Sequence, residues 1–243
     1  MTKLDVMHVS MQFSDSRAQK TSDAQKVFSR ASKRGVEWVT GTEAGQPELR
    51  QILNEQATRF SYRYYVRADV WIAVRKSLIV KGSYKTGFIK TLESSTGSKN
   101  FTDRGIAWVQ FLSEPYGQVS VGVSHYMTDG RKPGDEYYNA NTKLTRAIGE
   151  WGKENGKGRK LVFYAADANI VDRTDDVFRG APFTTLADEL KDHQDTGHGS
   201  IDIIASYDQD KRVKGKYWRV LDDKEFPLAT DHYLCEGGFE VGK

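Results

Sequence analysis

The stretch LVFYAADAN, residues 161–169, decides the fold class that this sequence predicts. Its first six residues are mostly apolar and lack helical spacing, which is typical of a strand buried on both faces. An acidic residue directly after such a strand lies at the carboxyl edge of the sheet, where open α/β sheets bind their ligands. Because side chains alternate along a strand, Asp167 and Asn169 can point to the same side. Taken alone, this pattern is more often an ordinary turn.

The composition is that of a globular chain with enough apolar material for a core. Of the 243 residues, 38% are hydrophobic and 28% are charged. We find no repeat, low-complexity tract or linker, so we expect one domain over residues 1–243. Cys235 is the single cysteine, which excludes an intrachain disulfide and fits a reducing compartment. The longest apolar runs are too short to span a membrane, and we expect a cytoplasmic monomer.

Extended and helical patterns alternate along the chain and predict an α/β fold. We expect helices at 22–34, from Pro47 onward, at 141–151 and, as a short element, at 185–190. Ser22 caps the first helix in this interpretation, and Gly35 ends it. Residues 93–104 are typical of an exposed loop. Strands are expected at 4–13, 36–40, 62–66, 70–74, 77–80, 105–112, 119–123, 161–166 and 201–205.

Several predicted strands end in, or lie next to, a side chain that can bind metal or transfer protons. Carboxylates with a few waters are the ligands that Mg²⁺ prefers in proteins. Histidine offers acid–base chemistry near neutral pH, and a buried aspartate can hold its ring in one tautomer. The residues in question are Glu43, His125, Asp167, Asn169, Asp202, Asp231 and His232.

The order of these residues resembles the endonuclease/exonuclease/phosphatase superfamily, which includes DNase I. The matching segments are GTE at 41–43, SHY at 124–126, DAN at 167–169, SIDII at 200–204 and TDH at 230–232. Each motif is short, but five of them in the family's order indicate a relationship over nearly the whole chain. The resemblance implies a four-layer α/β sandwich of DNase I type, with two mixed β-sheets packed face to face and helices outside.

The resemblance also implies how metal and water are held. Glu43 and Asp231 would bind Mg²⁺ or Mn²⁺ against a phosphate oxygen. Asp167 would orient or activate the attacking water, and Asn169 would donate a hydrogen bond to the phosphate. The alternative for each acid is a solvated side chain in a loop.

Two histidines complete the implied machinery. His232, oriented by Asp202, would transfer a proton or bind the phosphate. His125 would be a second contact to the phosphate or to the leaving group. The alternative for either one is a hydrogen-bonded histidine at the end of a strand.

The sequence departs from the family pattern at two points. The family has an asparagine at the end of the first strand, where this chain offers Ser10 or Gln12. The family also pairs its first histidine with a carboxylate, for which Asp69 is a candidate. The other histidines match no motif, and we assign structural or surface roles to His8, His193 and His198.

A basic segment, residues 211–219, combines five cationic side chains with two aromatic ones and has no acid. Cations neutralise phosphates and aromatic rings stack on bases, so this segment is a candidate nucleic-acid contact beside the site. An exposed hairpin with a basic outer face is the alternative. The net charge of +3 permits a polyanionic partner without requiring one. Arg104, before an apolar strand, resembles an arginine that family members place near the phosphate, and an exposed loop arginine is the alternative. With it, the nucleic-acid contacts that we predict are Arg104, Lys214, Lys216, Tyr217, Trp218 and Arg219.

Three functions remain open at this point. The first is a nuclease that depends on Mg²⁺ or Mn²⁺ and cleaves phosphodiesters in DNA or RNA, with DNA the expected partner. The second is a phosphatase or lipid phosphodiesterase of the same superfamily, acting on inositol phosphates or sphingomyelin. The third is a non-catalytic nucleic-acid-binding protein on the same scaffold. Metal-dependent hydrolysis separates the third from the other two.

Overall fold

Two β-sheets form the centre of the molecule. A computed structural model of the chain describes residues 1–11, 16–92, 103–127, 136–158, 160–169, 183–197, 202–207 and 211–242. The first sheet consists, in order across it, of β11 (Val213–Leu221), β12 (Leu234–Val241), β1 (Thr2–Ser10), β2 (Trp38–Thr42), β4 (Val70–Arg75) and β3 (Tyr62–Arg67). The second consists of β5 (Lys85–Leu92), β6 (Arg104–Ser113), β7 (Gly117–His125), β8 (Leu161–Asp167), β10 (Asp202–Tyr207) and β9 (Thr184–Thr185).

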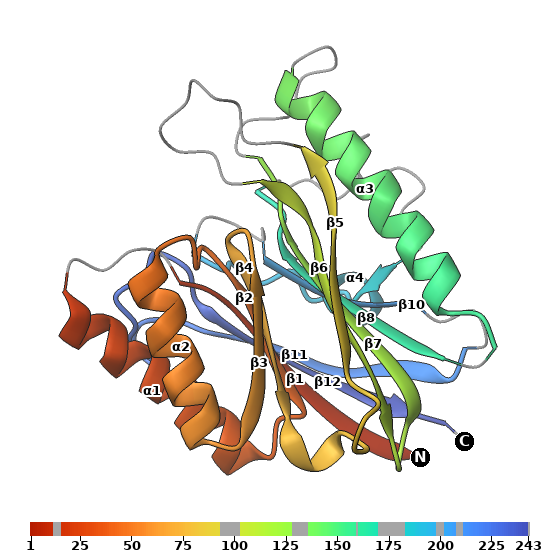
Figure 1. The fold of residues 1–243 in the computed structure, drawn as a ribbon, viewed down its shortest axis with the longest axis horizontal. Helices are drawn as coiled ribbons and strands as arrows, with labels where there is room; N and C mark the ends of the chain where they lie inside the picture. The colour runs from red at the N-terminus through yellow and green to blue at the C-terminus, as the bar shows by residue number, and fades with distance from the viewer. Residues whose placement is uncertain are drawn as a thin grey trace.

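The sheets pack face to face, and helices cover their outer surfaces (Figure 1). Apolar side chains of both sheets share one core, in which the ring centroids of Trp38 and Phe163 lie 4.9 Å apart. Helices α1 (Arg17–Arg34) and α2 (Pro47–Arg59) pack on the first sheet, and α3 (Glu136–Asn155) packs on the second. The short α4 (Leu186–Leu190) contributes Leu186 to the core between the sheets. These layers confirm the expected four-layer α/β sandwich.

Strand β1 illustrates why the sheets are buried on both sides. Leu4 and Val6 point into the core between the sheets, whereas Met7 and Val9 pack under the helices. Such alternation makes a strand apolar on both faces, because each face has a layer to bury against. No helix in the described part of the chain is long and apolar enough to cross a membrane.

Two helical crossovers determine where the functional side chains lie. Strands β1 and β2 are parallel and are joined by α1, and β7 and β8 are parallel and are joined by α3. Parallel neighbours end at the same edge of a sheet. Strand β10 runs antiparallel to β8, so it begins where β8 ends. The polar residues at these strand ends are therefore brought together.

The first helix begins earlier than the sequence pattern predicts. Ser16, not Ser22, is its N-cap, and the Ser16 hydroxyl accepts a hydrogen bond from the backbone N–H of Gln19. The extra turn at the start of α1 lacks apolar periodicity, because polar contacts and not apolar packing stabilise it. The ammonium of Lys20 is buried and donates hydrogen bonds to Gln46 and Glu48 of the α2 region. This tertiary contact has no signature in the local pattern.

The other errors concern the edge of the second sheet. The strand predicted at 77–80 is wrong, because a 3₁₀ helix, η1 (Lys76–Leu78), occupies this position. Strand β5 was not expected, because exposed polar residues interrupt its apolar positions, as edge strands allow. Most of the predicted loop at 93–104 lies outside the described residues, as do Gln12 and His198.

Candidate active site

Three of the predicted residues are neighbours because of strand register. His125 is the last residue of β7, and it stands opposite Asp167, the last residue of β8. Asp202 is the first residue of β10, and it stands opposite Asp167 on the other side. Residues far apart in the chain thus line one edge of the second sheet.

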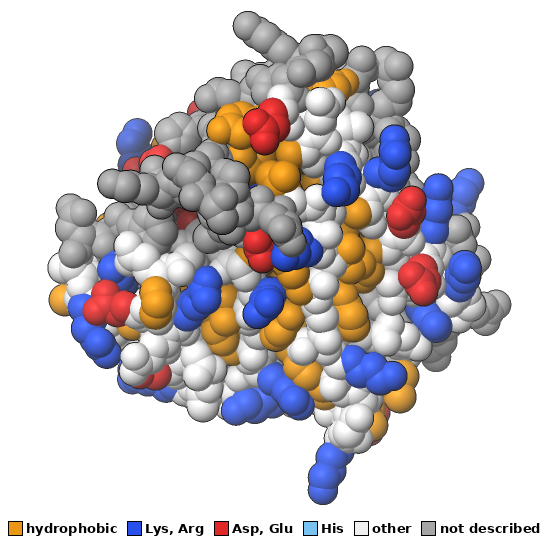
Figure 2. All heavy atoms as spheres, turned by 45° about the horizontal axis from the view of Figure 1, so that its top comes forward, with side chains coloured by type: hydrophobic (Ala, Val, Ile, Leu, Met, Phe, Trp, Pro, Cys, Tyr) orange, Lys and Arg blue, Asp and Glu red, His pale blue; other side chains and the backbone are white. Residues whose placement is uncertain are grey.

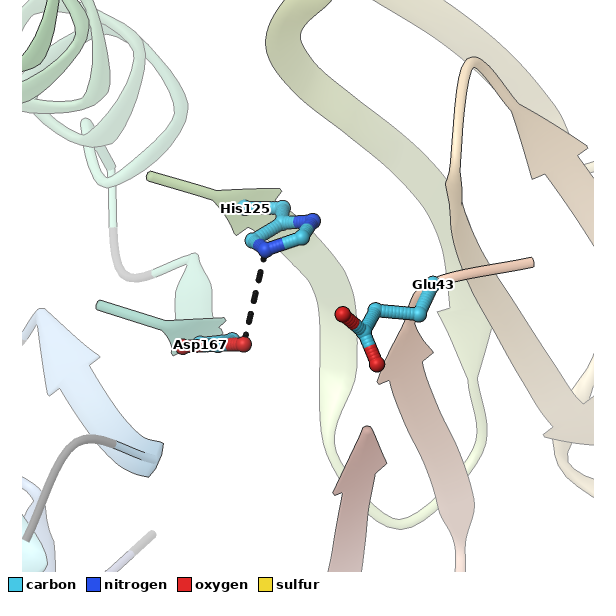
Figure 3. A group of neighbouring side chains, drawn as sticks. All are labelled: Glu43, His125 and Asp167. Atoms are coloured by element: carbon cyan, nitrogen blue, oxygen red, sulfur yellow. Dashed lines mark ion pairs between the residues drawn. The ribbon is translucent and has the colours of Figure 1, made fainter. Parts of the chain in front are cut away.

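Glu43 reaches the same place from the first sheet. One potential ligand atom from each of Glu43, His125 and Asp167 lies within 4.8 Å of the others. Figure 3 shows the Glu43 carboxylate pointing toward the gap in which His125 and Asp167 face each other. The Nε2 atom of His125 lies 3.4 Å from Oδ2 of Asp167. The ends of both sheets therefore contribute to one cluster of donors.

Glu43 has the properties expected of a ligand to a hard cation. It adopts a left-handed backbone conformation, with φ of 62°. Its Oε2 atom is buried and has no hydrogen-bond partner among the described residues. Burial raises the pKa of Glu43, although the nearby His125 opposes that shift. A divalent cation would satisfy this orphaned oxygen and favour the ionised carboxylate, so the site fits such an ion.

His232 and Asp202 form the second cluster, again with Asp167. The Nδ1 atom of His232 lies 2.8 Å from Oδ2 of Asp202, as the sequence predicts. Its Nε2 atom lies 3.8 Å from Oδ2 of Asp167. Burial alone would lower the pKa of His232, but the bond to Asp202 and the nearby carboxylates raise it to about 9. In the absence of metal, His232 is therefore a cation at neutral pH.

Asp167 belongs to both clusters and is held in place by the turn that follows it. Its Oδ1 accepts a hydrogen bond of 3.1 Å from the backbone N–H of Asn169. Burial raises the pKa of Asp167, and the charge of Asp202 acts in the same direction against the two histidines. The amide of Asn169, a residue with φ of 51°, donates to the backbone carbonyl of Tyr126. These two hydrogen bonds fix both side chains of the DAN motif.

The carboxylate that holds His125 is Asp69, the candidate that the family resemblance indicated. Oδ2 of Asp69 lies 2.8 Å from Nδ1 of His125 and 2.5 Å from Nη1 of Arg104. Although burial opposes it, the charges of His125 and Arg104 lower the pKa of Asp69 to about 2. Burial and Arg104 oppose protonation of His125, but Asp69 and Asp167 outweigh them and raise its pKa.

This arrangement corrects the role of Arg104. Arg104 is 9% exposed, and its guanidinium is engaged by Asp69 behind the site. It therefore supports the Asp69–His125 pair and does not lie on the surface as a direct contact to nucleic acid.

Sequence reasoning missed the role of His8, which it assigned to structure or surface. The ring is fully buried, with Nδ1 2.9 Å from Oγ1 of Thr40 and Nε2 3.4 Å from Oδ1 of Asp202. Asp202 is therefore flanked by two histidines. Burial favours its neutral form, but the bond to His232 and the His8 ring hold the pKa of Asp202 well below its usual range. A polar residue in phase with Leu4 and Val6 on β1 was the available signal.

Ser10 and Asp231 complete the surroundings of the clusters. Ser10, one of the two candidates at the end of β1, accepts a hydrogen bond of 2.7 Å from the Thr42 hydroxyl, next to Glu43. Oδ1 of Asp231 lies 3.9 Å from Nε2 of His232, and its side chain is 38% exposed. The described donor clusters do not include Asp231. Asp231 is thus exposed, whereas Glu43 is half-buried.

The basic segment does not lie beside the site, contrary to the prediction. In the register of the first sheet, Lys214 stands opposite Glu240 of β12, and Glu240 stands opposite Lys3 of β1. Ser10, at the site, is seven residues further along β1. At about 3.3 Å per residue this separates Lys214 from the site by roughly 23 Å. Lys216 lies near Lys214 at this end of β11, and its ammonium forms an ion pair with Glu240 at 3.1 Å.

The aromatic residues of this segment are also engaged elsewhere. Trp218 is 6% exposed and belongs to the core between the sheets, so the prediction that it stacks on a base is wrong. The Tyr217 hydroxyl donates a hydrogen bond of 3.1 Å to Asp5. Arg219 forms an ion pair with Glu225 at 2.6 Å. The strand thus buries Trp218 in the core and leaves Lys216 and Arg219 paired with acids on the outside.

Comparison with known proteins identifies the fold of this chain. No protein-family profile and no curated protein sequence matches this chain. Solved structures match it over nearly its whole length, and the chain has the fold of the endonuclease/exonuclease/phosphatase superfamily. This finding confirms, at the level of the fold, the resemblance that the motifs indicated.

Three solved structures illustrate the likeness. D. rerio TDP2 in complex with a single-strand DNA product has a TM-score of 0.76 at 15% identity, covering 99% of this chain and 100% of that one. An endonuclease/exonuclease/phosphatase family protein from Bacteroides thetaiotaomicron has a TM-score of 0.71 at 15% identity, covering 100% and 96%. A mannosyl-6-phosphatase from the same organism has a TM-score of 0.70 at 14% identity, covering 97% and 99%.

Proposed function

We propose that this protein is a divalent-metal-dependent phosphodiesterase that hydrolyses nucleic acid, with DNA as the expected substrate. One observation carries the proposal: Asp167 belongs to two donor clusters at once, one with Glu43 and His125 and one with Asp202 and His232. Such a set supplies both a cation site and two acid–base groups around one point. Metal-assisted hydrolysis of a phosphodiester can use these groups together.

Glu43 would hold the metal ion, because its Oε2 is the buried oxygen that no described residue satisfies. Asp231, which is exposed and adjoins His232, would complete the coordination together with water. Mg²⁺ and Mn²⁺ both accept such oxygen ligands. When bound, the ion would act as a Lewis acid on a non-bridging phosphate oxygen.

The other residues would then divide the proton transfers. Asp167, whose pKa is raised by burial, would orient the attacking water and accept its proton. Protonated His232, held by Asp202, would donate a hydrogen bond to a phosphate oxygen. His125, protonated and held by Asp69, would give its proton to the leaving oxygen. The phosphorus–oxygen bond to water forms as the bond to the leaving group breaks.

Two of the structural neighbours favour different substrates. TDP2 was solved with a single-strand DNA product, which supports a nucleic-acid phosphodiester. The mannosyl-6-phosphatase keeps a phosphomonoesterase as the second candidate. The two differ in whether the phosphate carries one organic substituent or two, so a direct assay separates them.

The test is hydrolysis by the purified protein with Mg²⁺, Mn²⁺ or EDTA. We expect cleavage of DNA and of bis-p-nitrophenyl phosphate with either metal and none with EDTA. His232→Ala, purified in parallel, controls for a contaminating nuclease. Hydrolysis of a sugar phosphate alone would establish the phosphatase instead. Binding of DNA without hydrolysis under any condition would leave a non-catalytic scaffold.

A further inference from the structure

The free edges of the two sheets lie side by side and form one surface. Strand β3 is the edge of the first sheet and β5 is the edge of the second (Figure 1). Two contacts join them: the Arg63 guanidinium lies 4.0 Å from the centroid of the Tyr84 ring, and that of Arg67 lies 6.0 Å from the centroid of Phe88. We call this surface, with the η1 turn beside it, the β3–β5 edge.

The β3–β5 edge is basic, and most of its charges are not neutralised by ion pairs. Figure 2 shows blue Lys and Arg side chains alternating with orange hydrophobic ones down the middle of this face. Within the described ranges no acid forms an ion pair with Arg63, Arg67, Lys76, Lys81 or Lys85, whereas the sixth exposed cation of this edge, Lys90, pairs with Asp103 at 3.8 Å. On β11, by contrast, Lys216 and Arg219 are paired with acids. Unpaired cations are the ones available to phosphates.

The two arginines of β3 are ordered before any ligand arrives. Stacking on an aromatic ring restricts a guanidinium while leaving its N–H donors free, so less entropy is lost when it binds phosphate. Its outer face can also stack on a base. Arg63 further lines a hollow of about 490 Å³ together with Lys76 and Lys81. This hollow would accommodate a phosphate or a nucleotide at the far end of the edge.

The edge leads into the candidate active site. Arg63 and Arg67 lie on the same face of β3, four residues and therefore roughly 13 Å apart. Asp69, two residues after Arg67, holds His125. On β5, Leu92 stands opposite Arg104 of β6, and Arg104 binds the same Asp69. A nucleic-acid strand bound along this edge would thus reach the Asp69–His125 pair, next to the site.

We propose that the β3–β5 edge binds single-stranded nucleic acid next to the bond that is cleaved; this inference rests on the proposed function. Charge, the stacked arginines and the direction toward His125 support it. The occupant is single-stranded because the half-buried rings of Tyr84 and Phe88 offer apolar contact to bases. In a duplex the bases are stacked on one another and do not offer their faces.

The experiment is fluorescence anisotropy with a labelled single-stranded DNA oligonucleotide in EDTA, so that binding is measured without hydrolysis. We expect Arg63→Ala/Arg67→Ala to raise Kd at least tenfold. The slope of log K against log salt should fall by about 1.4, because roughly 0.7 counterion per phosphate contact is lost. The matched control is Lys214→Ala/Lys216→Ala, which removes the same charge from the other edge of the first sheet and should change neither quantity.

Three results would overturn the inference. They are an unchanged Kd in the arginine variant, an equal loss in the lysine control, and an equal arginine dependence for duplex DNA. Circular dichroism of each variant checks the fold, which exposed substitutions should preserve. Hydrolysis of bis-p-nitrophenyl phosphate by the wild-type protein tests the proposed function separately. Absence of that hydrolysis would refute the enzyme while the binding result stood on its own.

Discussion

The two histidine–aspartate pairs of the site have the same local geometry and different electrostatic surroundings. In both, Nδ1 lies 2.8 Å from a buried carboxylate, in the pairs His232–Asp202 and His125–Asp69. Asp69 also binds Arg104, whose charge opposes protonation of His125. Asp202 has the His8 ring on its other side. Apart from burial, the strongest influence on the pKa of His125 is the charge of Arg104, whereas the strongest influence on the pKa of His232 is its bond to Asp202.

The largest effect should come from a carboxylate outside both pairs. Glu43→Gln keeps the size of the side chain and removes the charge that would hold the metal. We expect Mg²⁺ affinity measured by calorimetry to fall at least tenfold and hydrolysis to become undetectable. Unchanged metal affinity with retained activity would show that the cation is not held by Glu43. The two histidine–aspartate pairs would then act around a metal bound at another position.

Asp202→Asn should be the next most severe change, because it removes the charge on which His232 depends. We expect kcat to fall about 10²–10⁴-fold, the range typical of a lost acid–base group. His232→Ala combined with Asp202→Asn should cost little more than His232→Ala alone, since residues that act as a unit are not additive. Fully additive losses would mean that the two residues act independently.

Asp69→Asn should affect activity less than Asp202→Asn and stability more. The amide can still accept a hydrogen bond, but Arg104 is left buried without its countercharge. Breaking such a pair costs about 3 kcal/mol, which urea denaturation would detect. We expect kcat to fall about tenfold. If Asp69→Asn proved as damaging to kcat as Asp202→Asn at unchanged stability, the proposed asymmetry between the pairs would be wrong.

The smallest effect is a pH dependence of the metal-free protein. The pKa of His232 is about 9 when folded and about 6.5 when unfolded, so its protonation stabilises the fold. This contribution is complete below pH 6.5 and is lost as the pH rises to about 9, at most about 3 kcal/mol. NMR titration should give a His232 pKa near 9 in wild type and at least one unit lower in Asp202→Asn. An identical pKa in both proteins would refute the coupling.

Residues in regular strands with a motif at the end were predictable. The DAN motif at 167–169 and Asp202 were located correctly because a buried apolar strand and its terminal acid are encoded within a few residues. His8 was missed because its partner Asp202 is 194 positions away in the sequence and joins it only through the packing of the sheets. Trp218 was misassigned because a basic segment was interpreted by composition, although the alternation of β11 buries that ring.

By itself, the sequence determined the sandwich fold and the identity of most groups in the two donor clusters. Local patterns encode which residues form strands and which side chains end them, and the order of five motifs indicates how those ends combine. Only the tertiary structure decided which buried polar groups lie next to each other. Arg104 contacts Asp69, and His8 lies next to Asp202. The tertiary structure also decided that Arg63 and Arg67 of the β3–β5 edge lie without an ion pair among the described residues, whereas Lys216 and Arg219 of β11 are paired with acids. Pairing depends on distances across sheets, and short-range sequence patterns do not contain those distances.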